Sequence, residues 1–160
     1  MTSKGTLRIA PAGKRDIASV RALFAAYAAG LGVDLTPQGF DSEIAGLPGA
    51  YAPPRGAILL AFDCRATAMG SVALKPLNVR AGEIKRLYVM PSARGRGVGR
   101  KLMEAVLRRA RRIGYTEIKL DTLPHMKEAV ALYERLGFEP VAPYGSHPYP
   151  GLICFGRRLW

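Results

Sequence analysis

The chain has 160 residues, 49% of them hydrophobic, and a formal net charge of +12, the composition of one strongly basic globular domain over residues 1–160. Two cysteines, Cys64 and Cys154, are too few for a disulfide framework, and no Cys/His spacing suggests zinc, so we expect a metal-free protein of the reducing cytoplasm. No signal-peptide pattern opens the chain, and its longest apolar run, 57–62, is far shorter than the roughly 20 residues of a membrane span, so no membrane association is expected.

The first half of the chain predicts two helices and three strands. Apolar residues at helical spacing indicate a helix over 16–30, and Pro and Gly predict a loop over 47–56. The other predicted elements are a strand at 7–10, a short helix at 37–47, and hairpin strands at 57–62 and 67–75.

The second half predicts a strand and a helix on either side of a glycine-rich loop, and then a mixed set of elements. The helix begins at Val98 and ends at Gly114, because apolar positions repeat every three to four residues between them. The other predicted elements are strands at 83–89, 117–120, 138–141 and 152–160, and a helix at 126–136. This order predicts a mixed α/β sheet with helices on its faces.

The loop between the strand at 83–89 and the next helix is the most informative segment. Three glycines alternate in it with three arginines: Gly95, Gly97 and Gly99 with Arg94, Arg96 and Arg100. Glycine lets the backbone approach a ligand, the helix N-terminus offers unpaired N–H groups, and arginine donates bidentate hydrogen bonds. The spacing fits neither a Walker A loop nor a dinucleotide fingerprint. The loop therefore predicts a pyrophosphate site, and a purely structural tight turn is the alternative.

Positive charge is concentrated on the same segment. Residues 94–112 hold eight of the 24 basic residues against one acid, Glu104. Such a cluster fits a small anionic cofactor, a nucleic acid, or a solvated cationic face. No aromatic residue lies between Val98 and Ile113 to stack on bases, so the sequence does not favour nucleic acid.

Two motifs resemble one known family. Arg94-Gly-Arg-Gly-Val-Gly99 resembles the Arg/Gln-x-x-Gly-x-Gly/Ala signature of the GCN5-related N-acetyltransferase (GNAT) superfamily, and 129–138 looks like its second motif, Ala-x-x-Leu-Tyr-x-x-x-Gly-Phe. The resemblance implies a single GNAT-like α/β domain with a V-shaped, mostly antiparallel mixed sheet of six to seven strands and about four helices. It also implies acetyl-CoA as cosubstrate and an amine acceptor, with a small molecule favoured over a peptide or protein.

The resemblance also implies where the cosubstrate lies. The pantetheine arm would pair with the backbone of Leu87, Tyr88 and Val89, and the Val89 N–H would polarise the thioester carbonyl. The pyrophosphate would lie on the amides of the loop and first helical turn: Arg94, Gly95, Arg96, Gly97, Val98, Gly99 and Arg100. Met126 stands where the family often has an asparagine that contacts the cofactor, so that contact is not expected here.

Two side chains are candidates for proton transfer. Tyr133 occupies the family's tyrosine position and would protonate the departing thiolate, because a phenol of pKa about 10 can donate to a thiolate. A core tyrosine is the alternative. Glu83 matches the position of the base in some members, and an exposed carboxylate paired with an arginine is the equally weighted alternative.

The acceptor side is less readable. Aromatic residues on the first helix and in the Pro/Gly-rich loops would border the acceptor or simply pack: Tyr27, Tyr51, Tyr144, His147 and Tyr149. An inactive acetyl-CoA-binding regulator is a further functional alternative. Pairing of the last strand, which ends at Trp160, across a homodimer also stays open.

Overall fold

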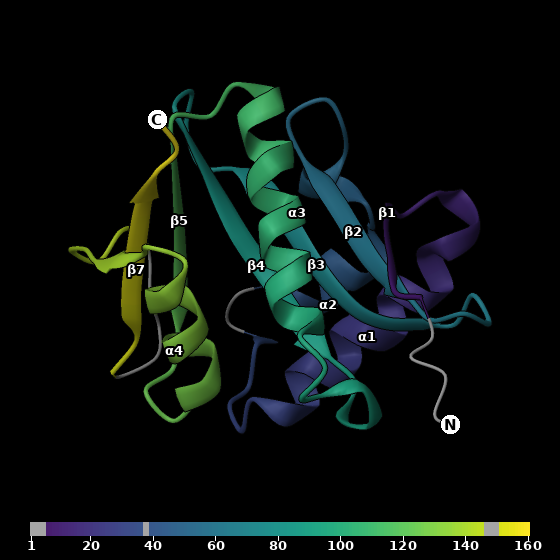
Figure 1. The fold of residues 1–160 in the computed structure, drawn as a ribbon. Helices are drawn as coiled ribbons and strands as arrows, with labels where there is room; N and C mark the ends of the chain where they lie inside the picture. The colour runs from purple at the N-terminus through teal and green to yellow at the C-terminus, as the bar shows by residue number, and fades with distance from the viewer. Residues whose placement is uncertain (1–5, 37–38, 146–150) are drawn as a thin grey trace.

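The described strands form one seven-stranded sheet in the order β1-β2-β3-β4-β5-β7-β6 (Figure 1). The computed structural model describes residues 6–36, 39–145 and 151–160. Every neighbouring pair is antiparallel except β4 and β5, which are parallel. The strands are β1 (Arg8–Pro11), β2 (Ala57–Phe62), β3 (Ala68–Pro76), β4 (Ala81–Val89), β5 (Glu117–Thr122), β6 (Glu139–Pro140) and β7 (Ile153–Arg158).

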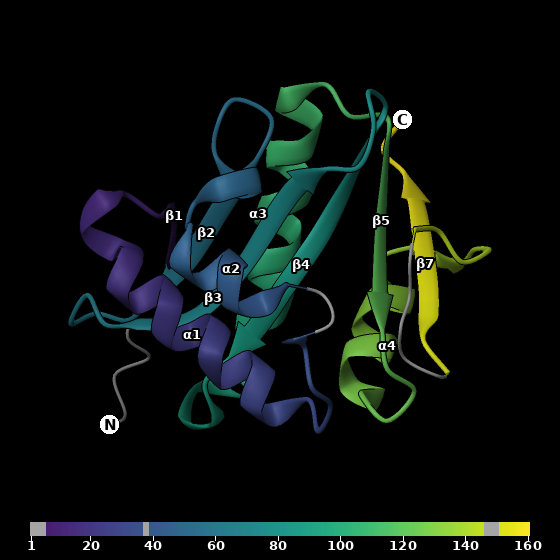
Figure 2. The same cartoon turned by 180° about the vertical axis from the view of Figure 1, so that it is seen from behind.

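Helices cover both faces of this sheet. The helix α3 (Val98–Ile113) crosses one face of β2, β3 and β4, and α4 (Lys127–Arg135) lies beside β5 and β7 (Figure 1). The helices α1 (Ile17–Gly30) and α2 (Phe40–Ala45) lie on the opposite face (Figure 2). Short 3₁₀ helices occur at Lys14–Asp16, Gly49–Tyr51 and Pro91–Ala93.

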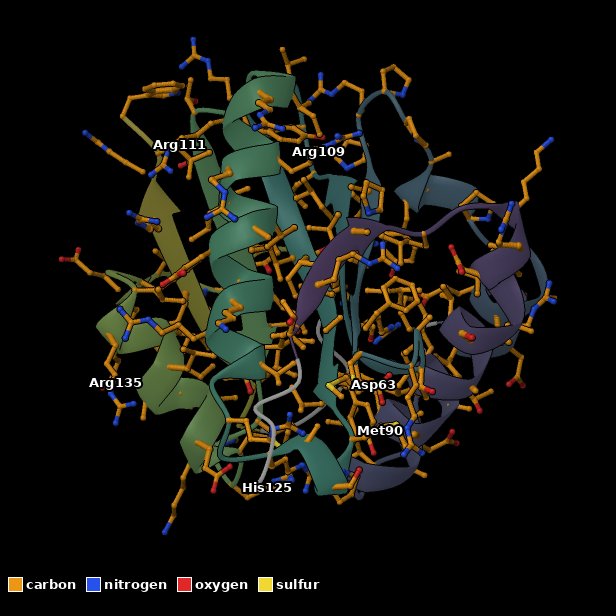
Figure 3. The ribbon with its side chains drawn as sticks, turned by 45° about the vertical axis from the view of Figure 1, so that its right-hand side comes forward. Asp63, Met90, Arg109, Arg111, His125 and Arg135 are labelled. Atoms are coloured by element: carbon orange, nitrogen blue, oxygen red, sulfur yellow. The ribbon has the colours of Figure 1, made fainter. Side chains whose placement is uncertain are left out.

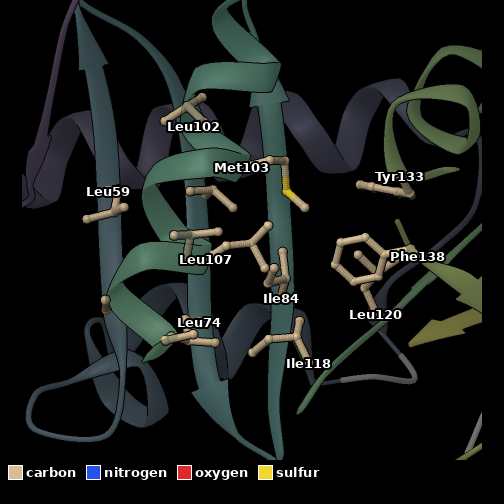
Figure 4. Packing of buried hydrophobic residues seen from close by; sticks show 14 of the residues in the cluster. Leu59, Leu74, Ile84, Leu102, Met103, Leu107, Ile118, Leu120, Tyr133 and Phe138 are labelled. Carbon is tan, nitrogen blue, oxygen red and sulfur yellow. The ribbon is translucent and has the colours of Figure 1, made fainter. Parts of the chain in front are cut away.

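The alternation of side chains along the strands separates the two cores. In β2, Leu59 and Ala61 pack on the α3 side, whereas Leu60 and Phe62 pack on the α1 side. This period of two is what a strand buried on both faces requires. On the α3 side the core is continuous across the sheet, from Leu59 to the aromatic rings of Tyr133 and Phe138 beside α4 (Figure 4).

The strands β4 and β5 separate soon after they begin. Their parallel pairing covers only residues 81–83 of β4 against 117–119 of β5, although β4 continues to Val89. Beyond Glu83 the two strands diverge, and no described strand pairs with the edge of β4 that faces β5. This is the V-shaped opening that the family resemblance implied.

The strand β4 also carries a bulge. Its register against β3 shifts between Ser71 and Ala73, and Arg86 has a positive φ of 61°. The Ser71 Oγ donates a hydrogen bond of 3.1 Å to the Arg86 carbonyl, which holds this conformation. A bulge re-aims the side chains that follow it. As a result, Lys85 and Arg86 are both directed away from the α3 core.

The predicted fold class is confirmed, and the boundaries differ locally. β4 begins at Ala81, two residues before the predicted start, because Ala81 and Gly82 already pair with Glu117 and Ile118 of β5. A Cβ at position 82 would lie 2.9 to 3.0 Å from Leu74 and Tyr115. From the sequence alone, this glycine suggests a turn. In the structure, the close packing of Leu74 and Tyr115 leaves no room for a side chain at this position. β6 is shorter than predicted, at Glu139–Pro140, although the Val141 N–H still donates to the Cys154 carbonyl at 2.9 Å. The predicted helix at 37–47 is Phe40–Ala45, and residues 37 and 38 lie outside the described residues.

Candidate active site

A groove of about 760 Å³ runs from the glycine-rich loop to the diverging edge of β4. Its floor includes Leu87, Tyr88 and Val89 of β4, and residues along the whole of α4 line it as well. Six of the seven predicted loop residues also line it: Arg94, Gly95, Gly97, Val98, Gly99 and Arg100. Arg96 is not among the lining residues, so the role predicted for its amide stays a prediction.

The N-terminus of α3 forms the polar end of this groove. Gly97 is the N-cap residue with a φ of +74°, and no side chain caps the helix. The first main-chain hydrogen bond of the helix is from the Lys101 N–H to the Gly97 carbonyl, at 3.1 Å. The N–H groups of Val98, Gly99 and Arg100 come before that bond, so they are the donors that a helix N-terminus offers to an anion. Gly99 brings this backbone close to the groove, with Leu132 and Val89 opposite it.

The exposed edge of β4 supplies main-chain donors at the other end. The Met90 N–H donates to the Met69 carbonyl of β3 at 2.8 Å. Residues in an antiparallel ladder turn alternately toward and away from their partner. Val89 therefore turns its N–H toward the groove, and Tyr88 turns its own toward β3. The Val89 carbonyl accepts a hydrogen bond from Arg94 Nε at 3.1 Å.

The helix α4 and the residue two positions before it contribute polar groups that the sequence motifs did not single out. His125, Lys127 and Arg135 line the groove, and His125 and Arg135 lie at the α4 end of the molecule, away from Arg109 and Arg111 (Figure 3). Spacing alone gave no signal for them, because their approach to the loop depends on how α4 packs. Lys127 and Arg135 add positive charge beside the donors of the α3 N-terminus.

Tyr133 lies where the groove meets a second, smaller cavity. It lines this cavity together with Ile84 and Leu87 from β4. The tyrosine is 6% exposed, and its ring contacts those of Phe138 and Phe155 at centroid distances of 5.9 and 6.2 Å. Within residues 6–36, 39–145 and 151–160 its hydroxyl has no hydrogen-bond partner. Desolvation by burial, with smaller effects of Tyr27 and Asp121, raises the pKa of the Tyr133 phenol above 10.0. The ring is therefore a core residue whose hydroxyl borders a cavity.

Glu83 lies at the point where β4 and β5 separate. It pairs in register with Lys119, and its side chain is only 7% exposed. The Tyr144 hydroxyl donates to its Oε2 at 2.9 Å, and Lys75 and Lys85 approach its carboxylate at 3.7 and 4.0 Å. The alternative of an exposed carboxylate paired with an arginine is wrong. The carboxylate is buried among lysines, because residues 75 and 85 lie on the same face of neighbouring strands.

The smaller cavity lies between β4, β5 and the C-terminal end of α1 (Figure 2) and has a volume of about 50 Å³. Its polar lining includes Tyr27, Lys85, Arg86 and Asp121. The other predicted acceptor-side residues fall elsewhere: Tyr51 packs in the α1 core, Tyr144 contacts Glu83, and His147 and Tyr149 lie outside the described residues. A lysine and an arginine next to each other inside an apolar strand were the sequence signal for this wall.

Met126 lines both the groove and the cavity and is the N-cap residue of α4, without a side-chain cap. It therefore supplies an apolar surface at the position of the family's asparagine. In the described ranges no group of three or more His, Cys, Asp or Glu residues is placed to hold a metal ion. None of the helices in those ranges is long and apolar enough to cross a bilayer.

Comparisons with known proteins agree on one family. Residues 29–138 match the family model of the acetyltransferase (GNAT) family. The chain is 36% identical over 140 residues to an uncharacterised N-acetyltransferase of Schizosaccharomyces pombe, which covers 87% of this chain and 86% of that protein. It is 40% identical over 70 residues to an IAA acetyltransferase of Azospirillum brasilense, covering 42% of this chain and 46% of the relative.

Solved structures show the same fold. A GNAT-family acetyltransferase from Staphylococcus aureus Mu50 superposes with a TM-score of 0.82 at 16% identity, covering 97% of this chain and 100% of its own. The acetyltransferase yncA of Salmonella typhimurium, solved with acetyl-CoA, gives a TM-score of 0.74 at 21% identity over 96% of this chain and 94% of its own.

Proposed function

Because this chain belongs to the acetyltransferase (GNAT) family, we propose that it transfers an acetyl group from acetyl-CoA directly to a primary amine within a ternary complex. As a family member it is an acetyl-CoA-dependent acetyltransferase; the acceptor class, the direct route and the residue roles are the proposal. One observation supports these parts of the proposal. The uncapped N-terminus of α3 lies at one end of the groove, and the unpaired edge of β4 and Tyr133 lie at the other.

The groove fits the parts of acetyl-CoA in sequence. The N–H groups of Val98, Gly99 and Arg100 would hold the pyrophosphate, because they are uncapped and lie at the positive end of a helix dipole. The main chain of Leu87 and Val89 would hold the pantetheine arm. When bound, acetyl-CoA supplies the thioester: a C–N bond forms, the C–S bond breaks, one proton leaves the amine and one reaches the sulfur.

Tyr133 would supply the proton at the sulfur end. Its hydroxyl borders the cavity that continues from the groove, and burial keeps the phenol protonated by raising its pKa. A protonated hydroxyl can donate a hydrogen bond to a developing thiolate. Without that donor, the negative charge that develops on sulfur would lack a hydrogen bond from the α4 side of the cavity.

Glu83 would take the proton from the amine. Its carboxylate lies at the closed end of the V, one residue from Ile84 of the cavity wall. Lys75 and Lys85 at 3.7 and 4.0 Å stabilise the carboxylate by opposite charge. If Glu83 instead serves only this ion cluster, Glu83→Gln will lower stability and leave the rate per folded enzyme unchanged.

The size of the cavity supports a small-molecule acceptor. Its volume is about 50 Å³, whereas one water needs roughly 10–15 Å³ of such space. The cavity therefore accommodates a few waters or one small polar group. A peptide would have to enter through a wider opening on the same side of the sheet.

Release of free CoA thiol in the presence of acetyl-CoA and a library of small primary amines tests the proposal. We expect thiol release that needs both substrates, with one acetyl group recovered on the amine for each thiol. A protein that binds no acetyl-CoA by titration calorimetry would refute the proposal. Binding without turnover on any amine would favour an inactive regulator.

A further inference from the structure

The bulge in β4 places two adjacent cationic side chains on the wall of the acceptor cavity. Neighbouring residues of a regular strand face opposite sides of a sheet. Here Lys85 and Arg86 both line the cavity, because the strand shifts register beside them. Two cations at consecutive positions of a largely buried strand form a costly arrangement, which a purely structural wall does not need.

Arg86 is held in place by a dedicated partner. Its guanidinium is 2% exposed and donates to the Glu43 carboxylate from Nε and Nη2, each at 2.8 Å. The rings of Phe40 and Tyr27 lie 5.2 and 5.5 Å from its Cζ. The third guanidinium nitrogen, Nη1, takes no part in the bonds to Glu43. Arg86 is thus fixed rigidly at the cavity wall, and the Tyr27 side chain with which it interacts lines the same cavity.

Lys85 is the less constrained of the two cations. Its side chain is 12% exposed, and among the described residues its ion pair is a long contact of 4.0 Å to Glu83. Pairs this long contribute less than a hydrogen-bonded contact. The ammonium of Lys85 can therefore reach an incoming anion without first breaking a short bond.

An acidic group faces these cations across the cavity. Asp121 of β5 lines the same space, and both Asp121 and Arg86 act electrostatically on Tyr27, which lies between α1 and the cavity. The cavity therefore has the cations Lys85 and Arg86 of β4 on one wall and the acid Asp121 of β5 on another. A ligand with one positive and one negative group would complement both strands.

We propose that the acceptor is a primary amine carrying a carboxylate close to the amine, as in an amino acid, with Lys85 and Arg86 recognising the carboxylate and Asp121 facing the amine. This inference rests on the proposed N-acetyltransferase function and names its substrate class. A polyamine is disfavoured, because two cations line the small cavity and like charges repel. An uncharged amine would leave Lys85 and Arg86 without an anion when it displaces water from them.

Matched acceptors test the inference directly. Each of a set of L-amino acids is compared with its own carboxamide, which keeps the amine and the side chain but has no negative charge. The carboxamide amine is the weaker base, so more of it is neutral at pH 7, and this biases the comparison against the proposal. We expect kcat/KM for the best amino acid to exceed that of its carboxamide by about ten- to a hundredfold, the range of one charge-assisted hydrogen bond.

The variant Lys85→Met separates recognition from catalysis. It removes the charge and keeps an unbranched apolar stem. We expect it to raise KM for the amino acid about tenfold and leave KM for the carboxamide unchanged, with unaltered affinity for acetyl-CoA. Lys14→Met, an exposed position on the short helix before α1, is the matched control and should leave the preference intact. If Lys85→Met acted only by disturbing Glu83, kcat would instead fall equally for the amino acid and the carboxamide.

The remaining outcomes separate the two proposals. Equal use of acid and carboxamide, or turnover only of amines without a carboxylate, overturns this inference and leaves the N-acetyltransferase function standing. If Lys85→Met keeps the full preference for the amino acid over its carboxamide, Lys85 does not recognise the carboxylate. Binding of acetyl-CoA with no amino acid acetylated overturns the inference as well, and absence of acetyl-CoA binding overturns both proposals.

Discussion

Tyr133 is both a core residue, through its ring, and a candidate proton donor, through its hydroxyl. Its ring packs against Phe138 and Phe155 as a core residue, and its hydroxyl borders the cavity. Desolvation raises the pKa of the phenol, which weakens it as an acid but keeps its proton in place across the physiological range. The residue therefore suits hydrogen-bond donation to a thiolate better than a role that requires it to lose its proton early.

Tyr133→Phe should retain the fold and lower kcat. We expect a loss of about ten- to a hundredfold, at the low end of general acid catalysis, with unchanged affinity for acetyl-CoA. Since the raised pKa keeps the phenol protonated, the ratio of wild-type to variant kcat should be the same at neutral pH and at about pH 9.5, close to the ordinary tyrosine pKa. Steady-state rates at both pH values check this. An unchanged kcat removes Tyr133 from the proton transfer, and a ratio that shrinks at the higher pH means that the phenol titrates early.

Tyr51 gives the clearest prediction for stability. Its hydroxyl is buried and has no hydrogen-bond partner among the described residues, although Glu43 lies nearby. Burial raises its pKa above the unfolded value of about 10, so the stability that depends on its protonated form is complete below that pH and is lost as pH rises.

Tyr51→Phe should therefore raise the free energy of unfolding by about 1 kcal/mol at pH 7, because it removes an unsatisfied buried polar group. It should also reduce the loss of stability above about pH 10, where the unfolded wild type ionises. Urea unfolding at the two pH values measures both effects. A destabilised variant with an unchanged alkaline loss would contradict this reading of Tyr51.

At the scale of elements, Gly99 lies where the first turn of α3 comes near both α4 and β4. A Cβ there would lie 3.6 Å from Leu132 and 3.7 Å from Val89, in ordinary contact. The position is helical, so a side chain adds no backbone strain. A larger side chain, by contrast, would fill the groove between the α3 N-terminus and β4.

The series Gly99→Ala and Gly99→Leu tests this geometry. We expect alanine to change the Kd for acetyl-CoA less than threefold and leucine to raise it at least tenfold, about 1.4 kcal/mol. Both variants should keep the wild-type Tm within a few degrees. Equal affinity in the leucine variant would show that acetyl-CoA does not pass between Gly99 and Leu132.

The ion pair of Glu43 with Arg86 joins α2 to β4. It is bidentate at 2.8 Å, and the guanidinium is almost completely buried. Removing one partner of such a pair leaves a buried charge uncompensated. We predict that Glu43→Gln lowers the free energy of unfolding by about 3 kcal/mol. The matched control is Glu104→Gln, which breaks the exposed i,i+4 pair with Arg100 and should cost at most about 0.5 kcal/mol. Equal losses in urea unfolding would contradict the structural role of the buried pair.

Local sequence patterns predicted the elements of the proposed cosubstrate site better than those of the proposed acceptor site. Glycines at Gly95 and Gly97 indicated the loop, and the structure has positive φ at both. Such signals are local, because a single residue type meets a single backbone requirement. The bulge at Arg86 and its partner Glu43, 43 positions away, depend on how α2 packs on the sheet. No spacing rule within β4 expresses that contact, so the pairing that fixes Arg86 at the proposed acceptor wall became readable only from the structure.

In the whole molecule, the opening of the sheet and the distribution of charge are consistent with one continuous site for acetyl-CoA and the proposed acceptor. The parting of β4 and β5 after residue 83 joins the groove on the α3 side to the cavity on the α1 side. Basic residues also continue along α3 to Arg109 and Arg111, at the end of the helix far from His125 (Figure 3). The groove is thus one end of a longer cationic face.

Titration of the ¹⁵N-labelled protein with acetyl-CoA, followed residue by residue through its amide resonances, tests the central claim most directly. We predict saturable shifts at Leu87, Val89 and the amides of 95–100, with the outer arginines Arg109 and Arg111 unaffected. Shifts centred on Arg109 and Arg111, with the amides of Val89 and Gly99 unchanged, would contradict the claim that acetyl-CoA binds between β4 and the N-terminus of α3.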